Sequence, residues 1–299
     1  MKLLNQIIVT IVQMMPRSIV WAFSKKYIAG KSLEEAVNLA KKLNEKGIHA
    51  TIDVLGEAIT NKDEAVESKV ECIQVLNSIE ENKLMANLSL KPTQLGLNLD
   101  ENFAYEQTKE ILEQAKSLKN FVRLDMEDSP YTDATINLYK KLLSDYGNVG
   151  IVVQAYLKRT FDDVVLLNKL GTNYRLCKGI YIEPQNIAYK ERQVIRDNYV
   201  KLLEAMFKSG NYVGIATHDE YLIDEAYRLI KELKISKDKF EFQMLLGVRE
   251  DLRDKINEDG YKIRIYVPFG EHWYKYSVRR LKENPTIAGH VFKNLFSLK

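Results

Sequence analysis

The sequence has few of the residues that build disulfide frameworks and metal sites. Of its 299 residues only Cys72 and Cys177 are cysteines, and they stand far apart in no redox or metal-binding spacing. This scarcity argues against a disulfide scaffold and indicates a reducing compartment, so we expect a cytoplasmic protein. The four histidines form no HxH or HExxH pattern, and we therefore expect no bound metal.

A strong charge of one sign and a long apolar run are also missing. The formal net charge is +3, and no basic run carries interleaved aromatic residues, which argues against a nucleic-acid partner. Residues 1–15, MKLLNQIIVTIVQMM, are apolar but shorter than the ~20 residues that span a bilayer. Amide side chains at positions 5, 6 and 13 interrupt this segment, which is atypical of a signal peptide. We expect an amphipathic helix that packs on the protein, with peripheral contact at the inner face of a membrane as the alternative.

The chain contains no low-complexity segment and no linker-like break; two patterns alternate along it instead. Short apolar runs rich in strand-forming residues alternate with stretches of helical periodicity that carry many Lys and Glu. The predicted strands are HATIDVLG (49–56), LMANLSLK (84–91), FVRLDME (121–127), VGIVVQAY (149–156), YRLCKGIY (174–181), YVGIATHD (212–219), FEFQMLLG (240–247) and IRIYVPFG (263–270). The predicted helices include residues 32–47, 64–82, 132–147 and 220–233.

Eight strands that alternate with helices predict an α/β fold, a parallel sheet closed into a (β/α)8 TIM-type barrel. A doubly wound open sheet is the competing architecture, but neither GxGxxG nor GxxxxGK[ST] occurs. We place an N-terminal helical segment at 1–40 and the barrel domain at 41–299. A helix directly after the eighth strand can fold over the mouth of the barrel.

Polar side chains stand at the end of every predicted strand. Active sites of such barrels lie at the C-terminal ends of the strands, so these side chains should converge on one mouth. A barrel without a site has no need to place Lys91, Asp125 and Arg175 inside apolar runs, because burying an unpaired charge is costly. The strand-end residues are Asp53, Glu57, Lys91, Asp125, Glu127, Gln154, Arg175, Lys178, Thr217, His218, Asp219, Gln243 and Tyr266.

Taken singly, several of these residues have ordinary structural explanations. Lys91 could end its strand by reaching to water, although Pro92 holds it in an extended conformation. Asp125 could cap the next helix, and His218 could be a hydrogen-bonded residue of no special function. The cationic groups suit an anionic small molecule, an anionic cofactor or both. A Schiff-base barrel that uses Lys91 or Lys178 and a redox barrel that holds a nucleotide cofactor both remain open.

The segment YKYSVRRLKEN (274–284) carries a pair of adjacent arginines. On a helix, i, i+3, i+4 and i+7 spacing places four polar residues on one face: Tyr276, Arg279, Arg280 and Glu283. On spacing alone this face would be solvated. If the helix folds over the barrel mouth, the same face turns inward.

Eight ordered motifs over roughly residues 40–290 resemble the proline dehydrogenase family in its short bacterial form. They are DVLGEA (53–58), SLK (89–91), RLDMED (123–128), VVQAYLKRT (152–160), YRLCKGIY (174–181), GIATHD (214–219), FQMLLGVR (242–249) and RIYVPFGEHWYKYSVRRLKENP (264–285). The resemblance implies a distorted barrel that binds FAD at the strand C-termini. It also implies oxidation of L-proline to 1-pyrroline-5-carboxylate, with a membrane quinone as electron acceptor. A separate pyrroline-5-carboxylate dehydrogenase would then carry out the next step, since 299 residues leave no room for a second catalytic domain.

The same resemblance implies roles for individual residues. Arg279 and Arg280 would clamp the proline carboxylate with Lys91 as a third cation, and Glu283 would hold the arginine pair. Asp125 would orient the arginine side of the site, and Arg175 would lie near the flavin N5. The walls around the proline ring would be Tyr181, Leu245, Tyr266 and Tyr276. FAD would be held by Gln154, Lys178, Gly179, Ile180, Thr217, His218 and the backbone at Met126. A Schiff-base lyase and a non-catalytic amino-acid-binding barrel are the alternatives.

Overall fold

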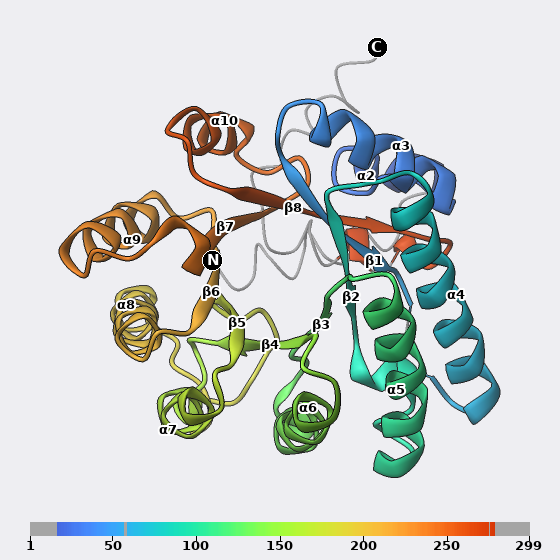
Figure 1. Cartoon of the computed structure of the whole chain (residues 1–299), viewed down its shortest axis with the longest axis horizontal. Coiled ribbons are helices and arrows are strands. Elements are labelled where there is room, and N and C mark those ends of the chain that lie inside the picture. Colours follow the sequence, from blue (N-terminus) through green and yellow to red (C-terminus); the bar gives the residue numbers. More distant parts are fainter. Residues whose placement is uncertain (1–16, 57–58, 275, 279–299) are drawn as a thin grey trace.

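The computed structural model of the chain describes residues 17–56, 59–274 and 276–278, and these build a closed barrel (Figure 1). Eight parallel strands pair in chain order, and β8 closes the barrel against β1. The strands are β1 His49–Val54, β2 Ala86–Leu90, β3 Val122–Leu124, β4 Val149–Gln154, β5 Asn173–Cys177, β6 Tyr212–Ala216, β7 Phe240–Leu245 and β8 Ile263–Phe269. The predicted barrel is confirmed. Each strand ends before the predicted residue, because the polar residues at the mouth leave the ladder and enter loops.

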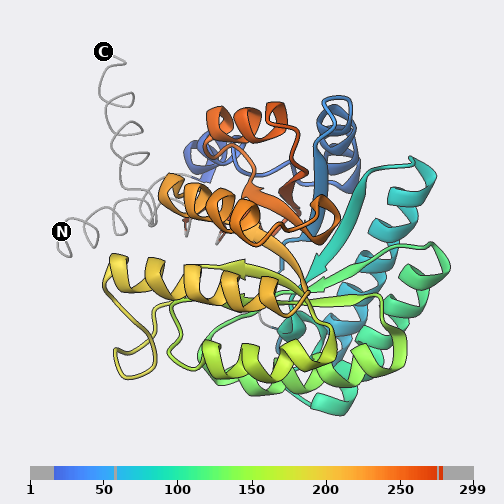
Figure 2. The same cartoon turned by 60° about the vertical axis from the view of Figure 1, so that its left-hand side comes forward.

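Helices surround the barrel, and the view in Figure 2 shows how they run along its outside. After α2 (Arg17–Ser24) they are α3 Leu33–Asn44, α4 Lys62–Glu81, α5 Glu101–Ser117, α6 Thr132–Tyr146, α7 Thr160–Leu167, α8 Arg192–Lys208, α9 Glu220–Glu232 and α10 Glu250–Glu258. Short 3₁₀ turns lie at η1 Pro92–Leu95, η2 Ser129–Tyr131, η3 Asn168–Leu170 and η4 Lys237–Lys239. The four predicted helices correspond to α3, α4, α6 and α9. The division at residue 40 stays a prediction, since α3 crosses it without a break.

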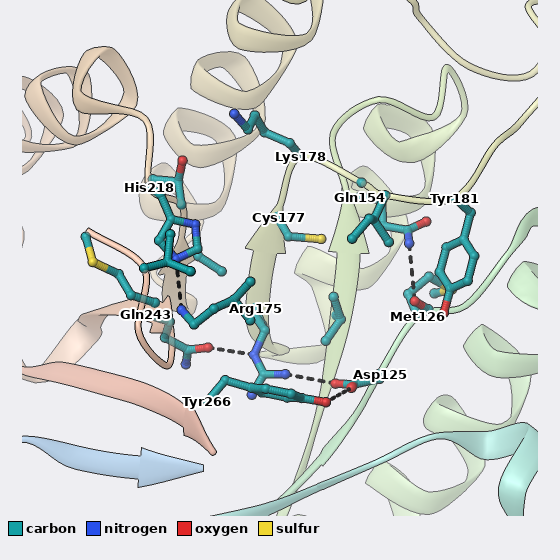
Figure 3. A pocket seen from close by; sticks show the side chains of 18 of the residues that line it. Asp125, Met126, Gln154, Arg175, Cys177, Lys178, Tyr181, His218, Gln243 and Tyr266 are labelled. Atoms are coloured by element: carbon teal, nitrogen blue, oxygen red, sulfur yellow. Dashed lines mark hydrogen bonds and ion pairs between the residues drawn. The ribbon is translucent and has the colours of Figure 1, made fainter. Parts of the chain in front are cut away.

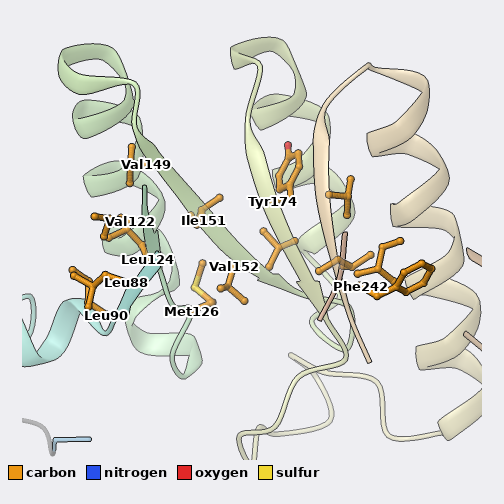
Figure 4. Packing of buried hydrophobic residues seen from close by; sticks show 14 of the residues in the cluster. Leu88, Leu90, Val122, Leu124, Met126, Val149, Ile151, Val152, Tyr174 and Phe242 are labelled. Atoms are coloured by element: carbon orange, nitrogen blue, oxygen red, sulfur yellow. The ribbon is translucent and has the colours of Figure 1, made fainter. Parts of the chain in front are cut away.

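The core lies between the strands and the helices (Figure 4). The strands are buried on both faces, as expected of a parallel sheet covered by helices; all six residues of β4 are buried. Leu88, Leu124 and Ile151 from neighbouring strands are fully buried in one continuous cluster. This packing gives the strand ends a rigid base from which side chains can be positioned.

The inside of the barrel also contains buried charges far from the mouth. Glu241 and Arg264 are the second residues of β7 and β8, and their side chains pair at 2.6 Å. The Arg123 guanidinium donates to the backbone oxygen of Asn173 at 2.6 Å. Buried charges within apolar strands are therefore not reserved for the mouth, contrary to our expectation. At the opposite end of the barrel Glu241 and Arg264 form an ion pair and Arg123 is hydrogen-bonded to Asn173, so these charges serve the fold.

The chain before the barrel packs on the residues that follow β8. Residues 273, 274 and 276–278 are helical, and Trp273, Tyr276 and Val278 are buried. They share an apolar cluster with Val20 and Tyr27. The amphipathic helix predicted at 1–15 lies outside the described residues. Within the described ranges, no helix is long and apolar enough to cross a bilayer.

Candidate functional site

A cavity of about 480 Å³ opens at the C-terminal ends of the strands, within the ~300–1,000 Å³ typical of ligand pockets. Every predicted site residue that the structure describes lines this cavity, and Figure 3 labels several of them. These residues are Lys91, Asp125, Met126, Gln154, Arg175, Lys178, Gly179, Ile180, Tyr181, Thr217, His218, Leu245, Tyr266 and Tyr276. The roles expected for them stay predictions. Arg279, Arg280 and Glu283 lie outside the described residues. The cavity is also lined by residues outside the predicted set: Tyr27, Val152, Cys177, Ala216, Gln243, Met244 and Val248.

Asp125 is the centre of a network of hydrogen bonds. Its Oδ1 accepts from the Arg175 guanidinium at 2.8 Å and from the Ser89 hydroxyl at 2.7 Å. Its Oδ2 accepts from the Tyr266 hydroxyl at 3.1 Å. The interpretation of Asp125 as a helix cap is therefore wrong, because the carboxylate points into the barrel and joins three other strands.

Lys91 is turned inward. Its ammonium donates to both carboxylate oxygens of Asp53 at 3.0 Å and lies 3.9 Å from Asp125 Oδ2. Burial acts to lower the pKa of Lys91, but the attraction of Asp53 and Asp125 outweighs it and raises the pKa above its ordinary value. The amine stays protonated, so it can bind an anion but is a poor nucleophile. The idea that Lys91 reaches to water is wrong.

Arg175 is fixed from several sides. Its Nε donates to Gln243 Oε1 at 2.6 Å, and its Nη1 donates to Ser89 Oγ at 3.1 Å. The guanidinium carbon lies 5.5 Å from the centre of the Tyr266 ring. Burial and, to a lesser extent, the nearby Asp125 carboxylate raise the pKa of Tyr266 well above 10. The phenol therefore keeps its proton and donates a hydrogen bond to Asp125.

Ser89 and Gln243 hold the predicted residues in place, although neither was among the predicted site residues. Ser89 bridges Asp125 and Arg175 from β2. The sequence does contain a signal for Ser89, because side chains alternate between the two faces of a strand. Ser89 lies two residues before Lys91 and therefore faces the same side. Gln243 was recognised only as a strand-end polar residue. Its partner could not be read from the sequence, because β5 and β7 are not neighbouring strands.

A second group of side chains lies on the other side of the cavity. Gln154 Nε2 donates to the Met126 carbonyl at 3.2 Å, whereas the buried Gln154 Oε1 has no hydrogen-bond partner among the described residues. The Leu245 N–H donates to His218 Nε2 at 2.9 Å. That nitrogen must therefore be unprotonated. Gln154 thus offers an acceptor to a ligand, and His218 Nε2 is already occupied.

Positive charge gathers at the rim of the cavity around Asp219. Its carboxylate accepts from Arg196 at 2.6 Å and 3.0 Å and from Lys178 at 3.3 Å, and Arg192 lies 3.5 Å away. Burial acts to raise the pKa of Asp219, but Arg196 and Lys178 outweigh it and lower the pKa to about 2. Three cations against one carboxylate leave an excess of two positive charges. The rim therefore suits an anionic ligand.

Two other titratable groups near the mouth do not offer chemistry. Glu127 accepts from the Thr93 N–H at 3.0 Å and the Thr93 hydroxyl at 2.7 Å, so it anchors η1. Burial raises the pKa of the Cys177 thiol to about 12, which leaves it protonated and unreactive. Within residues 17–56, 59–274 and 276–278, no group of three or more His, Cys, Asp or Glu could hold a metal ion.

The chain has clear relatives among characterised families. The sequence model of the family described as proline dehydrogenase matches residues 36–292. The chain is 38% identical to proline dehydrogenase 2 of Bacillus subtilis (strain 168), over 90% of this chain and 89% of that protein. It is 34% identical to the proline dehydrogenase of Deinococcus radiodurans, over 95% of this chain and 93% of that protein.

Solved structures of proline utilization A (PutA) share the fold. The PutA of Bdellovibrio bacteriovorus, inactivated by N-propargylglycine, matches 88% of this chain with a TM-score of 0.83 and 25% identity. The PutA of Corynebacterium freiburgense matches 98% of this chain with a TM-score of 0.76 and 23% identity. This chain covers only 33% and 34% of those two PutA chains. The likeness therefore concerns one part of a longer protein.

Proposed function

The chain belongs to the proline dehydrogenase family of oxidoreductases, and on this premise we propose that it oxidises L-proline to 1-pyrroline-5-carboxylate with FAD. The substrate would lose two electrons and two protons, and a membrane quinone would receive the electrons. The observation that carries the proposal is the convergence of Lys91, Asp125, Arg175 and Tyr266 in one cavity. This convergence provides cations beside a flat aromatic wall, which suits a small cyclic amino acid with a carboxylate.

The residues present fit FAD. The unpartnered Gln154 Oε1 is a buried acceptor, which suits a ring N–H donor of a flavin. The excess positive charge around Asp219 suits a diphosphate. When bound, FAD supplies the acceptor for two electrons. The residues proposed to hold it are Gln154, Lys178, Gly179, Ile180, Thr217, His218 and the backbone of Met126.

The protein's own groups bind and orient the substrate. Protonated Lys91 provides a point charge for the carboxylate, and we propose that Arg279 and Arg280 clamp the same group. Asp125 holds the Arg175 guanidinium in a fixed position. A cation held there would stabilise the additional electron density of the reduced flavin. His218 Nε2 accepts from Leu245 and is not available as a base, so the proline nitrogen releases its proton to solvent.

The protonated state of Lys91 weighs against a Schiff-base lyase. An imine-forming lysine needs a neutral amine, which usually comes from a lowered pKa. Here Asp53 and Asp125 raise the pKa of Lys91, and its ammonium group donates to both carboxylate oxygens of Asp53. The same pair explains the lysine without any covalent chemistry.

We also propose that the enzyme contacts the inner face of the membrane that contains the quinone. The loop between β5 and α8 exposes Ile182 fully and Ile180 by 37% of its surface. Ile180 lines the cavity, and Lys178 and Arg192 lie at the two ends of the loop. Exposed apolar side chains next to cations are typical of surfaces that touch anionic lipid.

Replacing Arg279 or Arg280 by methionine is expected to raise KM for L-proline by a factor of about 10 or more. A charge-assisted hydrogen bond contributes ~1.5–3 kcal/mol, and each variant would lose such bonds to the carboxylate. The measurement is steady-state turnover with a redox dye, together with detection of 1-pyrroline-5-carboxylate. Arg228→Met on the surface of α9 is the control, since in the described structure the ion pairs of that arginine are with Glu225 and Glu232 of its own helix. An unchanged KM in both variants would refute the clamp.

A further inference from the structure

The cavity has a wall that comes from outside the region matched by the family. Tyr27 lines it, and the family match begins only at residue 36. We name residues 25–31, which join α2 to α3, the strap. Tyr27 is 7% exposed and packs in an apolar cluster with Tyr276, one of the predicted walls of the proline site.

The strap is tied to the mouth of the barrel through its backbone. The Ala29 N–H donates to the Pro268 carbonyl at 2.9 Å, and the Gly270 N–H donates to the Gly30 carbonyl at 3.1 Å. These two bonds extend the pairing of the chain just where β8 ends. They place Tyr27, two residues earlier, at a fixed depth beside the cavity.

A close backbone approach locks the other side of the strap. A Cβ atom added at Gly247 would lie 2.1 Å from the Lys26 carbonyl oxygen, a distance that no packed structure allows. Gly247 also has a φ of +70°, which other residues rarely adopt. The loop after β7 and the strap can therefore touch only because this residue is glycine.

The strap also carries the start of the helix after β8. Lys31 of the strap pairs with Glu271 at 3.1 Å, and just before the strap, in α2, the ring centroid of Trp21 lies 4.7 Å from that of Trp273. Tyr276 lies three residues beyond Trp273, one turn along the same helix. The strap and the start of this helix therefore belong to one packed cluster, which holds two tyrosines of the cavity wall, Tyr27 and Tyr276.

We propose that Tyr27 is a specificity-determining residue whose ring, fixed by the strap, limits the size of the cyclic amino acid that the site accepts. The proposal rests on the proposed function, because it takes L-proline as the substrate. A hydrophobic wall discriminates against one extra methylene by about 10–200-fold. L-pipecolate, whose ring is one methylene larger, is therefore the natural probe.

The experiment compares kcat/KM for L-pipecolate with kcat/KM for L-proline in Tyr27→Ala, Tyr27→Phe and the wild type. Tyr27→Ala is expected to raise this ratio about 10-fold, because it opens the wall. Tyr27→Phe keeps the ring and is expected to stay within about 2-fold of the wild type. Tyr221→Ala is the control, since that tyrosine is exposed and does not line the cavity.

A second pair of variants tests the strap without touching the cavity wall. Gly247→Ala drives a methyl group against Lys26 and is expected to raise the same ratio. Gly210→Ala is the matched control, because Gly210 has a φ of +74° and open space around its Cβ position. It carries the same backbone strain without the clash, so its ratio is expected to remain that of the wild type.

The outcomes separate this inference from the function itself. If the wild type oxidises L-proline and Tyr27→Ala is folded with an unchanged ratio, the inference is overturned and the function stands. If the wild type shows no turnover, the ratio of kcat/KM values is replaced as the readout by the rise in Tm that L-pipecolate causes, compared with the rise that L-proline causes. The variants are expected to rank in the same order by this comparison. If Tyr27→Ala does not fold, Tyr27→Leu and Gly247→Ala decide. The inference is supported if the ratio rises in Tyr27→Ala, Tyr27→Leu and Gly247→Ala and in none of the control variants.

Discussion

Asp125→Asn is expected to lower kcat/KM for L-proline by about 100-fold and to destabilise the protein. Breaking a buried ion pair by removing one partner costs ~3–5 kcal/mol, because the other charge is left uncompensated. Arg175 is 8% exposed and Asp125 15%, so little water can compensate. Asparagine has nearly the shape of aspartate, but its side chain is neutral. It places an NH2 donor where one of the two carboxylate oxygens accepts hydrogen bonds from Arg175, Ser89 or Tyr266.

Asp133→Asn provides the matched control for this prediction. Asp133 accepts from Arg159 at 2.5 Å, but the two side chains are 76% and 39% exposed. Exposed ion pairs contribute ~0–1 kcal/mol, so its kcat/KM and its free energy of unfolding should barely change. Both variants are measured by steady-state kinetics and by urea unfolding. Equal losses in the two would show that Asp125 has no special role in the site.

Lys91→Met is expected to lower the free energy of unfolding by ~3–5 kcal/mol at pH 7. Asp53 is fully buried and Lys91 is its ionic partner, so the variant leaves a carboxylate without a cation. In the folded variant Asp53 keeps its proton at pH values where the unfolded chain has lost it. The loss of stability should therefore be small below the ordinary aspartate pKa of ~3.9 and grow as the pH rises above it.

Lys69→Met is the control for that prediction, because the side chains of Lys69 and Lys91 are 13% and 14% exposed. The partner of Lys69 is Glu110, which is 50% exposed and remains hydrated when the lysine is removed. Urea unfolding of both variants near pH 3.5 and at pH 7 checks the difference. A loss in Lys91→Met that does not depend on pH would contradict the assignment of Asp53 as its partner.

Much of the fold could be predicted because the two periodicities in the sequence are strong. β4 is apolar up to the polar Gln154 at its end, and α9 alternates buried and exposed residues with the period of a helix. The end of each strand was less predictable. Residues such as Lys178 and Thr217 continue the pattern of the strand before them, but they lie beyond the last paired residue because the chain turns at the mouth.

The position of strand-end residues such as Lys91, Asp125 and Arg175 followed from one geometric rule, that parallel strands of a barrel end at the same mouth. Residues such as Tyr181 and Tyr276 were implied only by the resemblance to the family. The pairing of the strand-end residues did not follow from the rule. Lys91 and Asp53 are 38 residues apart, and Arg175 meets Gln243 across 68 residues. Such partners depend on the stagger of the strands around the barrel, which no local pattern encodes.

Tyr27 was missed for a different reason. Tyr27 precedes the motifs that carry the resemblance. It lies within residues 1–40, for which the sequence predicts only a helical segment. Its place in the cavity depends on two backbone hydrogen bonds to Pro268 and Gly270, whose donors could be residues of any type except proline. Gly247 is the one visible signal, and a single glycine in a loop does not say what lies against it.

The absorption spectrum of the purified protein, recorded anaerobically before and after addition of L-proline, shows directly whether the chain is a flavin-dependent proline dehydrogenase. We expect a yellow protein whose oxidised-flavin bands disappear when L-proline is added, since the bound amino acid reduces the cofactor. Asp125→Asn should show the same starting spectrum and a slower loss of it. A folded protein that takes up no FAD, or one whose flavin stays oxidised in the presence of L-proline, would refute the proposed function.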